Sequence, residues 1–300
     1  MVDRIASFVQ TSKLINNNLS IQAKYAEGQI QLSSGFKSDT YQGIAKDTNK
    51  LLNLESEFAR IQTQTENAQT ALDRSESAFD SYGSIITVGQ AFIGDLRAAI
   101  NGIAPPSEIQ TIAENNLNQT ASILNTTVAG RFIFGGSATT SPPVDLNDPG
   151  FGGAVPPSAA NTNYYQGNSF TQSVEIADNF TVNYGVKADD PALEQIIRAY
   201  DLVRTSPNNQ AALTEALSLL ESGLDDLAVS KANISQHSQT FDRRITENQE
   251  QLTLIESMIS NVRDVDLAEV SIRLQEFEAQ LQASYSVTTN LLQLKITDFI

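Results

Sequence analysis

The chain of 300 residues contains no cysteine, no tryptophan and a single histidine. Without cysteine it forms no disulfide and has no thiolate to act as a nucleophile or metal ligand. The one histidine, His237, cannot build a usual zinc site without cysteine partners. These absences exclude thiol chemistry and the common zinc sites.

Basic charge and long apolar runs are also scarce. Nineteen lysines and arginines face 35 aspartates and glutamates, so the net charge is −16. Binding to nucleic acid or to an anionic membrane surface requires a basic face. No apolar run approaches the roughly 18 residues of a transmembrane helix, and the first residues lack the pattern of a secretory signal. We therefore expect no nucleic-acid partner, no membrane insertion and no Sec signal peptide.

Groups of residues typical of catalysis are missing from the sequence as well. The acidic pair Asp225–Asp226 and the run Asp264–Asp266 are more typical of solvated helix faces or helix breaks than of acid–base dyads. The pair Gly135–Gly136 lacks the lysine and serine or threonine of a phosphate-binding loop. The sequence predicts no enzyme, with no catalytic, cofactor-binding or metal-binding residues.

What the chain does contain is a long heptad repeat without proline from Ile44 to Ile100. Thr65 is its one polar member, and the positions three residues further on are small or apolar apart from Ser75. This spacing predicts a long helix with one narrow buried seam, roughly 90 Å long from Ile44 to Ile103. The predicted core positions are Ile44, Leu51, Phe58, Leu72, Phe79, Ile86 and Ile93.

A second repeat steps by four and three residues from Leu213 to Val262. As a helix it would be roughly 75 Å long, which suits it to pair with the first. Lys231, Ser238 and Asn248 are its polar members, and a few polar core residues cost stability but help to fix register. The predicted core positions are Leu217, Leu224, Ile234, Phe241, Ile245, Leu252 and Ile259.

Both ends of the chain are amphipathic but weakly apolar, and the phase of the repeat shifts across residues 263–266. Such segments are marginal as isolated helices, so we expect them to fold by packing against partners. The predicted assembly residues are Ile5, Phe8, Ile15, Leu19, Val270, Leu274, Phe277, Leu281 and Leu291.

Between the two long repeats the sequence changes character. Pro105–Pro106 ends the first repeat, a helix is expected from Ser107 to Val128, and short alternating strands are expected at 164–165, 173–176 and 180–186. Another helix is expected from Asp190 to Val203. The predicted fold class is mainly α, an elongated antiparallel coiled-coil or helical-bundle rod with a small inserted β-rich domain.

Three stretches resemble a known family. They are Arg131–Ser137 (Arg-Phe-Ile-Phe-Gly-Gly-Ser) with the following Thr139–Pro143, Leu32–Gly35 (Leu-Ser-Ser-Gly), and the ending on Asp298-Phe-Ile300. Together they resemble the bacterial flagellar hook–filament junction proteins (hook-associated protein 3), which are relatives of flagellin. The residues after Gly35 depart from typical flagellins, because the Arg-Ile-Asn sequence is missing.

The resemblance implies a domain organisation. Residues 1–40 and 264–300 would pair as an axial coiled coil (D0), residues 41–130 and 191–263 would form the rod (D1), and residues 131–190 would form an outward-facing, D2-like insertion. These assignments come from family analogy.

It also implies a function. The chain would be a structural subunit of the adaptor zone between hook and filament, extracellular and exported by the flagellar type III system. Its implied partners are other copies of itself, hook-associated protein 1, flagellin and a cytoplasmic flagellar export chaperone. Flagellin itself is the first alternative, and a cytoplasmic coiled-coil scaffold is a more distant one.

Overall fold

A computed structural model describes the backbone of residues 2–293. Contacts divide the chain into two compact units, Met1–Ala59 with Leu252–Ile300, and Arg60–Gln251. The predicted boundaries at 40/41 and 263/264 lie inside the first unit, and the predicted insertion 131–190 lies inside the second. In chain order the elements are α1 (Val2–Ser34), the 3₁₀ helix η1 (Tyr41–Ile44), α2 (Thr48–Ile100), α3 (Pro106–Leu124), β1 (Thr127–Val128), β2 (Arg131–Phe132), β3 (Ser173–Ala177), β4 (Phe180–Asn183), α4 (Pro191–Thr205), α5 (Gln210–Arg263) and α6 (Leu267–Gln293).

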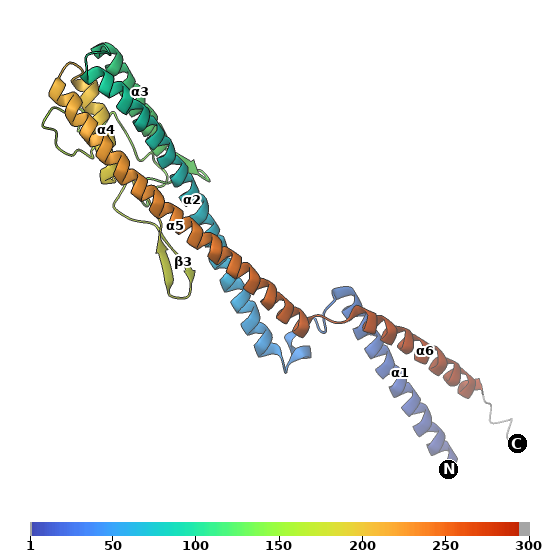
Figure 1. Ribbon diagram of the computed structural model, residues 1–300. Helices are drawn as coiled ribbons and strands as arrows, with labels where there is room; N and C mark the ends of the chain where they lie inside the picture. Colours follow the sequence, from blue (N-terminus) through green and yellow to red (C-terminus); the bar gives the residue numbers. More distant parts are fainter. Residues whose placement is uncertain (1, 294–300) are drawn as a thin grey trace. The chain divides into compact units, whose positions relative to one another are not determined.

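In the second unit α2 and α5 run antiparallel, as the two repeats predict (Figure 1). Arg97 of α2 pairs with Glu221 of α5 at 2.7 Å, and Lys231 of α5 lies over the ring of Phe79. The helices therefore pair from the α2 C-terminus down to the middle of both. The mainly helical fold class with a small β-rich insertion is confirmed.

On α2 the most buried face changes along the helix. Among the predicted core residues, Leu72 is buried, but Phe79, Ile86 and Ile93 are half-buried. The positions three residues after heptad positions are buried at Ile61, Ala68, Tyr82 and Leu96. A second buried line is formed by Ala71, Ala78, Ile85, Phe92 and Ala99. A straight helix drifts relative to a strict heptad. From Ala78 onward α3 and α4 cover the second line, and Ala71 packs in the cluster that contains the β3–β4 hairpin.

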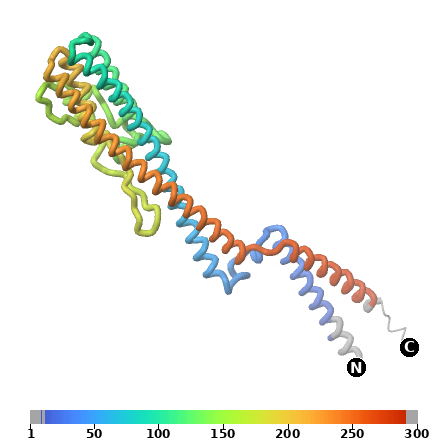
Figure 2. The backbone as a smooth tube through the Cα atoms, viewed as in Figure 1, coloured from blue at the N-terminus to red at the C-terminus, as the bar shows by residue number. Residues whose placement is uncertain are grey.

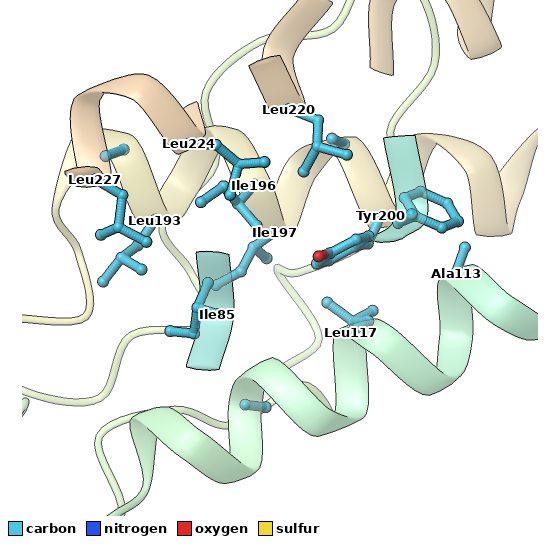
Figure 3. Close-up of a cluster of buried hydrophobic side chains, with 14 of the residues drawn as sticks. Ile85, Ala113, Leu117, Leu193, Ile196, Ile197, Tyr200, Leu220, Leu224 and Leu227 are labelled. Atoms are coloured by element: carbon cyan, nitrogen blue, oxygen red, sulfur yellow. The ribbon is translucent and has the colours of Figure 1, made fainter. Parts of the chain in front are cut away.

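On α5 burial follows the predicted repeat closely. Leu224, Ile234, Phe241 and Ile245 are buried, and Leu217 is half-buried. Figure 3 shows Leu220, Leu224 and Leu227 of α5 facing the apolar side chains of α4, whose other side faces α3. On the α4 and α3 side the labelled residues are Leu193, Ile196, Ile197, Tyr200, Ala113 and Leu117. This four-helix cluster, which includes Ile85 of α2, is the largest core of the chain.

The insertion consists of two separate two-stranded antiparallel sheets in the described residues. β1 and β2 are joined by Ala129–Gly130, both with positive φ, a combination typical of a tight hairpin turn. The β3–β4 hairpin packs on the long helices through Ile176 and Val182, and Tyr184 contacts Phe241 edge-on at 5.7 Å. Residues 164–165 form a single bridge to Val144 instead of the expected strand.

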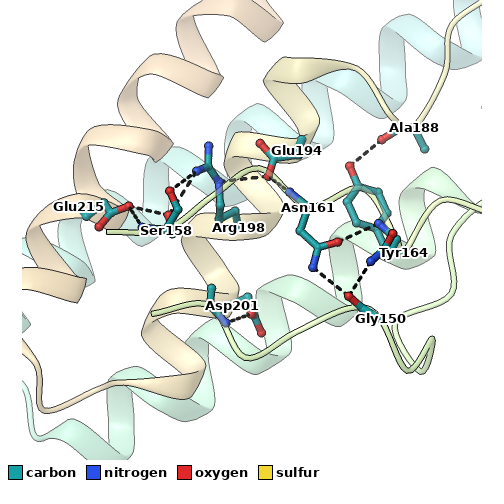
Figure 4. Close-up of polar contacts among 11 residues, drawn as sticks. Gly150, Ser158, Asn161, Tyr164, Ala188, Glu194, Arg198, Asp201 and Glu215 are labelled. Atoms are coloured by element: carbon teal, nitrogen blue, oxygen red, sulfur yellow. Dashed lines mark hydrogen bonds and ion pairs between the residues drawn. The ribbon is translucent and has the colours of Figure 1, made fainter. Parts of the chain in front are cut away.

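The proline- and glycine-rich loop before β3 is tied to the helices by the buried carboxylates of Glu194 and Asp201 and by the half-buried carboxylate of Glu215 (Figure 4). On α4, Asp201 accepts a hydrogen bond from the backbone N–H of Ala154 at 2.9 Å, and Glu194 accepts one from Asn161 at 2.9 Å. Glu215 of α5 accepts from Ser158 N–H at 2.8 Å. Each carboxylate satisfies a backbone donor that the loop cannot pair internally. The loop is therefore part of the packed unit.

Candidate assembly surfaces

The first unit is built around the antiparallel pair of α1 and α6 (Figure 2). Gly28 of α1 lies against Leu274 of α6, and a Cβ added at Gly28 would be 2.8 Å from Leu274 Cδ2. Further along, the side chains of Asn18 and Ser284 are hydrogen-bonded. The absence of a side chain at Gly28 lets the two helices approach closely.

The predicted assembly residues of α6 lie on its face toward α1. Val270 and Leu274 are buried, and Phe277 and Leu281 are half-buried. Val270, Leu274 and Phe277 line a groove together with Lys24 and Gly28 of α1. The apolar repeat of α6 is thus largely used inside the chain. The side chain of Leu291, like those of Ile5 and Phe8, lies outside the described residues.

On α1 the face toward α6 is one residue out of phase with the predicted seam. The covered positions are Leu14, Asn18, Ile21, Tyr25 and Gly28. The predicted residues Ile15 and Leu19 follow these by one position and are 49% and 58% exposed. The signal for the covered face is present in the sequence, since Leu14, Ile21 and Tyr25 also recur at helical spacing. It is no weaker than the signal for Ile15 and Leu19.

On the other side of α1 four apolar residues at helical spacing are exposed, Ile15, Leu19, Ala26 and Ile30, and we call them the outer stripe. At 3.6 residues per turn these side chains fall within an arc of roughly 60°. Ala23, Ala26 and Ile30 line a groove that is also lined by residues 37–40. α1 therefore has one apolar face occupied by α6 and a second face open to a partner.

Exposed apolar side chains are concentrated in the first unit. Among the side chains that the structure describes, thirteen of the eighteen large apolar residues that are exposed belong to residues 1–59 or 252–300. This unit is the smaller of the two, so its larger number of exposed apolar residues does not follow from its length. Large exposed apolar surfaces mark interaction sites in soluble proteins.

Where α1 ends and α6 begins, two short segments are hydrogen-bonded to each other. Gly35, at φ +75°, ends α1, and its carbonyl accepts from Val265 N–H at 2.9 Å. Lys37 N–H donates to the Arg263 carbonyl at 2.8 Å, and the Arg263 guanidinium lies 4.4 Å from the centroid of the Phe36 ring. We call these residues, 35–37 and 263–265, the clasp. It joins the entry and exit of the terminal pair.

Asp264 is the charged centre of the clasp. Partial burial raises the pKa of its carboxyl, but hydrogen bonds from Arg263 and Ser260 and the charges of Arg263 and Lys37 outweigh this and hold the pKa below its ordinary value of 3.8. Arg263 Nε lies 2.9 Å from the Asp264 carboxylate. The charged form of Asp264 therefore stabilises the clasp.

The remaining predicted core residues lie in the helical stretch of the first unit beside the clasp. Leu51 of α2 and Ile255, Ile259 and Val262 of α5 are buried. Ile44, Phe58 and Leu252 are half-buried. In this stretch Leu52, Leu254 and Met258 are exposed.

The described residues offer little for chemistry. None of their acidic or histidine side chains gather in threes with a geometry that could hold a metal ion. His237 lies on α5 beside a hollow that is also lined by Lys187, Asp189 and Asp190. Asp190 caps α4 through Ala192 N–H. Within the described part of the chain, no helix has the length and apolarity to span a membrane.

Comparison with known proteins shows a family similarity in the C-terminal part of the chain. Residues 217–300 match the bacterial flagellin C-terminal helical region. This stretch contains most of α5 and all of α6, the helices that carry the second repeat and the clasp. The C-terminal part of this helical chain is thus similar to that region of flagellin, which supports a structural role in the bacterial flagellum.

Two solved structures share its fold. One, assigned as a flagellar hook-associated protein from Vibrio parahaemolyticus, has a TM-score of 0.58 at 18% identity and covers 75% of this chain and 99% of its own. The other, FlgL from Bacillus cereus, has a TM-score of 0.52 at 16% identity and covers 64% of this chain and 98% of its own. At these identities the likeness establishes the fold alone. No sequence match to a curated protein was found.

Proposed function

We propose that the chain is a structural subunit of the flagellum that forms the adaptor zone between hook and filament. It assembles head to tail into a helical tube through α1 and α6. The observation that carries this proposal is the outer stripe of α1, an apolar face left open beside the pair of terminal helices. A contact between different faces of identical subunits generates a filament when it does not close into a ring.

The junction role is favoured over a free coiled-coil scaffold by the combination of features. The flagellin C-terminal region ends in a helix whose own apolar repeat is used against α1. The fold shared with the hook-associated protein structure extends over 75% of this chain. A cytoplasmic scaffold explains the long seam but gives no reason for an open face on the terminal pair.

Flagellin, the filament subunit itself, is the second candidate. The match of residues 217–300 to the flagellin C-terminal region favours it. The stretch Arg131–Ser137 and the departure after Gly35 favour the junction protein. In the structure, Phe134 of this stretch is buried and stacks on Tyr82 at 5.9 Å, so the middle of the stretch builds the core, while Arg131 and Ser137 at its ends are exposed.

The proposal includes partners and an export route. The neighbours are other copies of the chain, hook-associated protein 1 on the hook side and flagellin on the filament side. A cytoplasmic flagellar export chaperone would hold the C-terminal segment before passage through the flagellar type III channel, which places the assembled protein outside the cell. The proposed assembly contacts are the outer stripe and the terminal residues Ile5, Phe8 and Leu291.

Antibody labelling of isolated flagella tests the proposal. A junction subunit gives a short labelled zone at the distal end of the hook, and its deletion leaves hooks without filaments while flagellin appears in the medium. Labelling along the whole filament supports flagellin instead. A protein that stays inside the cell and is absent from isolated flagella contradicts both.

A further inference from the structure

The seam between α2 and α5 in the second unit contains polar side chains at three matched heights. Phe79 meets Lys231, and Ala68, Ala71 and Leu72 share a cluster with Phe241 and Ile245. Ser75 and Ser238 lie midway between these two contacts on their helices, so they share one level.

The other two levels follow from the same contacts. Thr65 lies three residues beyond Ala68, and Asn248 three residues beyond Ile245, which places this polar pair at a second level. Lys231, together with Phe79 and Gly83, makes the third. We call these the three polar levels.

These polar groups are costly where they lie. Ser75 is 2% exposed and Asn248 is 3% exposed. The Ser75 and Ser238 hydroxyls and the Asn248 side-chain nitrogen have no hydrogen-bond partner among the described residues. A buried polar group without a partner destabilises the folded state relative to an apolar group of the same shape. Stability alone would therefore favour apolar residues here.

The third level is shaped around one side chain. The Lys231 ammonium lies 4.3 Å from the centroid of the Phe79 ring. A Cβ added at Gly83 would be 2.7 Å from Lys231 Nζ. The lysine therefore occupies space that the missing side chain of Gly83 leaves, and its cation faces the aromatic ring.

We propose that the three polar levels select the register in which α2 and α5 pair. The apolar positions repeat every seven residues, so a shift by one heptad, about 10 Å along the axis, would still bring apolar rows together. In the observed register Ser75 lies level with Ser238 and Thr65 with Asn248, and Lys231 lies level with Phe79 and Gly83. The shift would separate them, for example by bringing Asn248 to the height of Leu72 and Ser238 to that of Tyr82.

These residues determine the register in which the two helices pair, and they do not determine whether the helices form. Polar residues at core positions act in this way in coiled coils, where they cost stability and exclude alternative alignments. The levels of Ser75 with Ser238 and of Thr65 with Asn248 lie outside the largest core cluster, along the stretch of the seam where α3 and α4 no longer hold the two long helices. The Lys231 level lies at the edge of that cluster, beside Phe79.

The test measures register directly on the full chain. Since the chain has no cysteine, Thr70→Cys and Thr246→Cys introduce two unique spin-label sites on exposed faces of α2 and α5. The distance between the two spin labels is measured in this double-cysteine protein, the parent, and in a variant that also carries Ser75→Ala, Ser238→Ala and Asn248→Leu. The matched control carries Ser84→Ala and Thr87→Ala, two exposed hydroxyls on α2.

The parent and the control should each give one distance. The variant without the buried polar groups should melt no lower than the parent, yet show a second distance, with the shifted population increased roughly tenfold or more. A single, unchanged distance in that variant overturns the proposal. If the triple variant fails to fold, Asn248→Leu alone decides, by the same two outcomes.

Discussion

Leu274 of α6 packs directly on Gly28 of α1, so closely that a Cβ at position 28 would be 2.8 Å from Leu274 Cδ2. Leu274 cannot move freely because it is buried in the same seam as Val270. This contact makes the pairing of the terminal helices sensitive to a single side chain.

We expect Gly28→Leu to separate α1 from α6. Overpacking costs about 1–3 kcal/mol, and α6 should lose protection in amide hydrogen exchange while α3 and α4 keep theirs. Gly94→Ala is the control, because an added Cβ there has no neighbour within 4 Å, and it should stabilise α2 by about 0.5–1 kcal/mol. Unchanged exchange in α6 would contradict the packing.

Ile15→Asp with Leu19→Asp places two charges on the outer stripe. Both side chains are exposed, so the helical content of the isolated chain should change little, while assembly should be lost because the open apolar face is removed. Assembly is followed by electron microscopy and by the labelled zone at the hook. Ser20→Asp, an exposed polar position on the same helix, is the control. Tubes that form as well from the double variant as from Ser20→Asp would rule out the stripe as a contact.

Asp201→Ala removes the carboxylate that accepts from Ala154 N–H at 2.9 Å and pairs with Arg204. Leaving a buried donor without a partner costs about 1–3 kcal/mol. We expect lower stability to urea and faster proteolysis between residues 151 and 163. Asp225→Ala, an exposed carboxylate on α5, should change neither. Equal proteolysis of the two variants would show that the carboxylate does not hold the loop.

The clasp should weaken in acid. The pKa of Asp264 is lower in the folded chain than its ordinary value of 3.8, so its stabilising effect is complete above 3.8 and is lost as the pH falls through the lower folded value. The Lys37 and Val265 amides, which bond across the clasp, should lose protection from hydrogen exchange over that range, relative to the unfolded chain at the same pH. Asp264→Asn should abolish this pH dependence. An NMR titration of Asp264 at or above 3.8 would disprove the assignment.

Much of the fold can be predicted from local sequence. Asp190–Pro191 marks the start of α4, and the structure shows the Asp190 side chain capping that helix. The phase shift at residues 263–266 marks the break between α5 and α6. These features depend on interactions within a few residues, which the sequence displays directly.

The faces of the long helices are harder to predict. On α5 the repeat and the burial coincide at Leu224, Phe241 and Ile245. On α2 the burial moves away from Ile86 and Ile93 toward Ile85 and Phe92, because α3 and α4 add a second neighbour. A heptad repeat shows the spacing of the apolar residues along a helix, but it does not show how many neighbouring helices pack against them.

The sequence by itself determined that long helices form, where they break, and that thiol chemistry is excluded. Tertiary structure alone decided which stripe of α1 faces α6. The stripes at Leu14 and Ile15 have similar apolar content, so intrinsic pattern does not separate them. Packing against Gly28 and Leu274 does, because the free energy of burying a face depends on the shape of its neighbour.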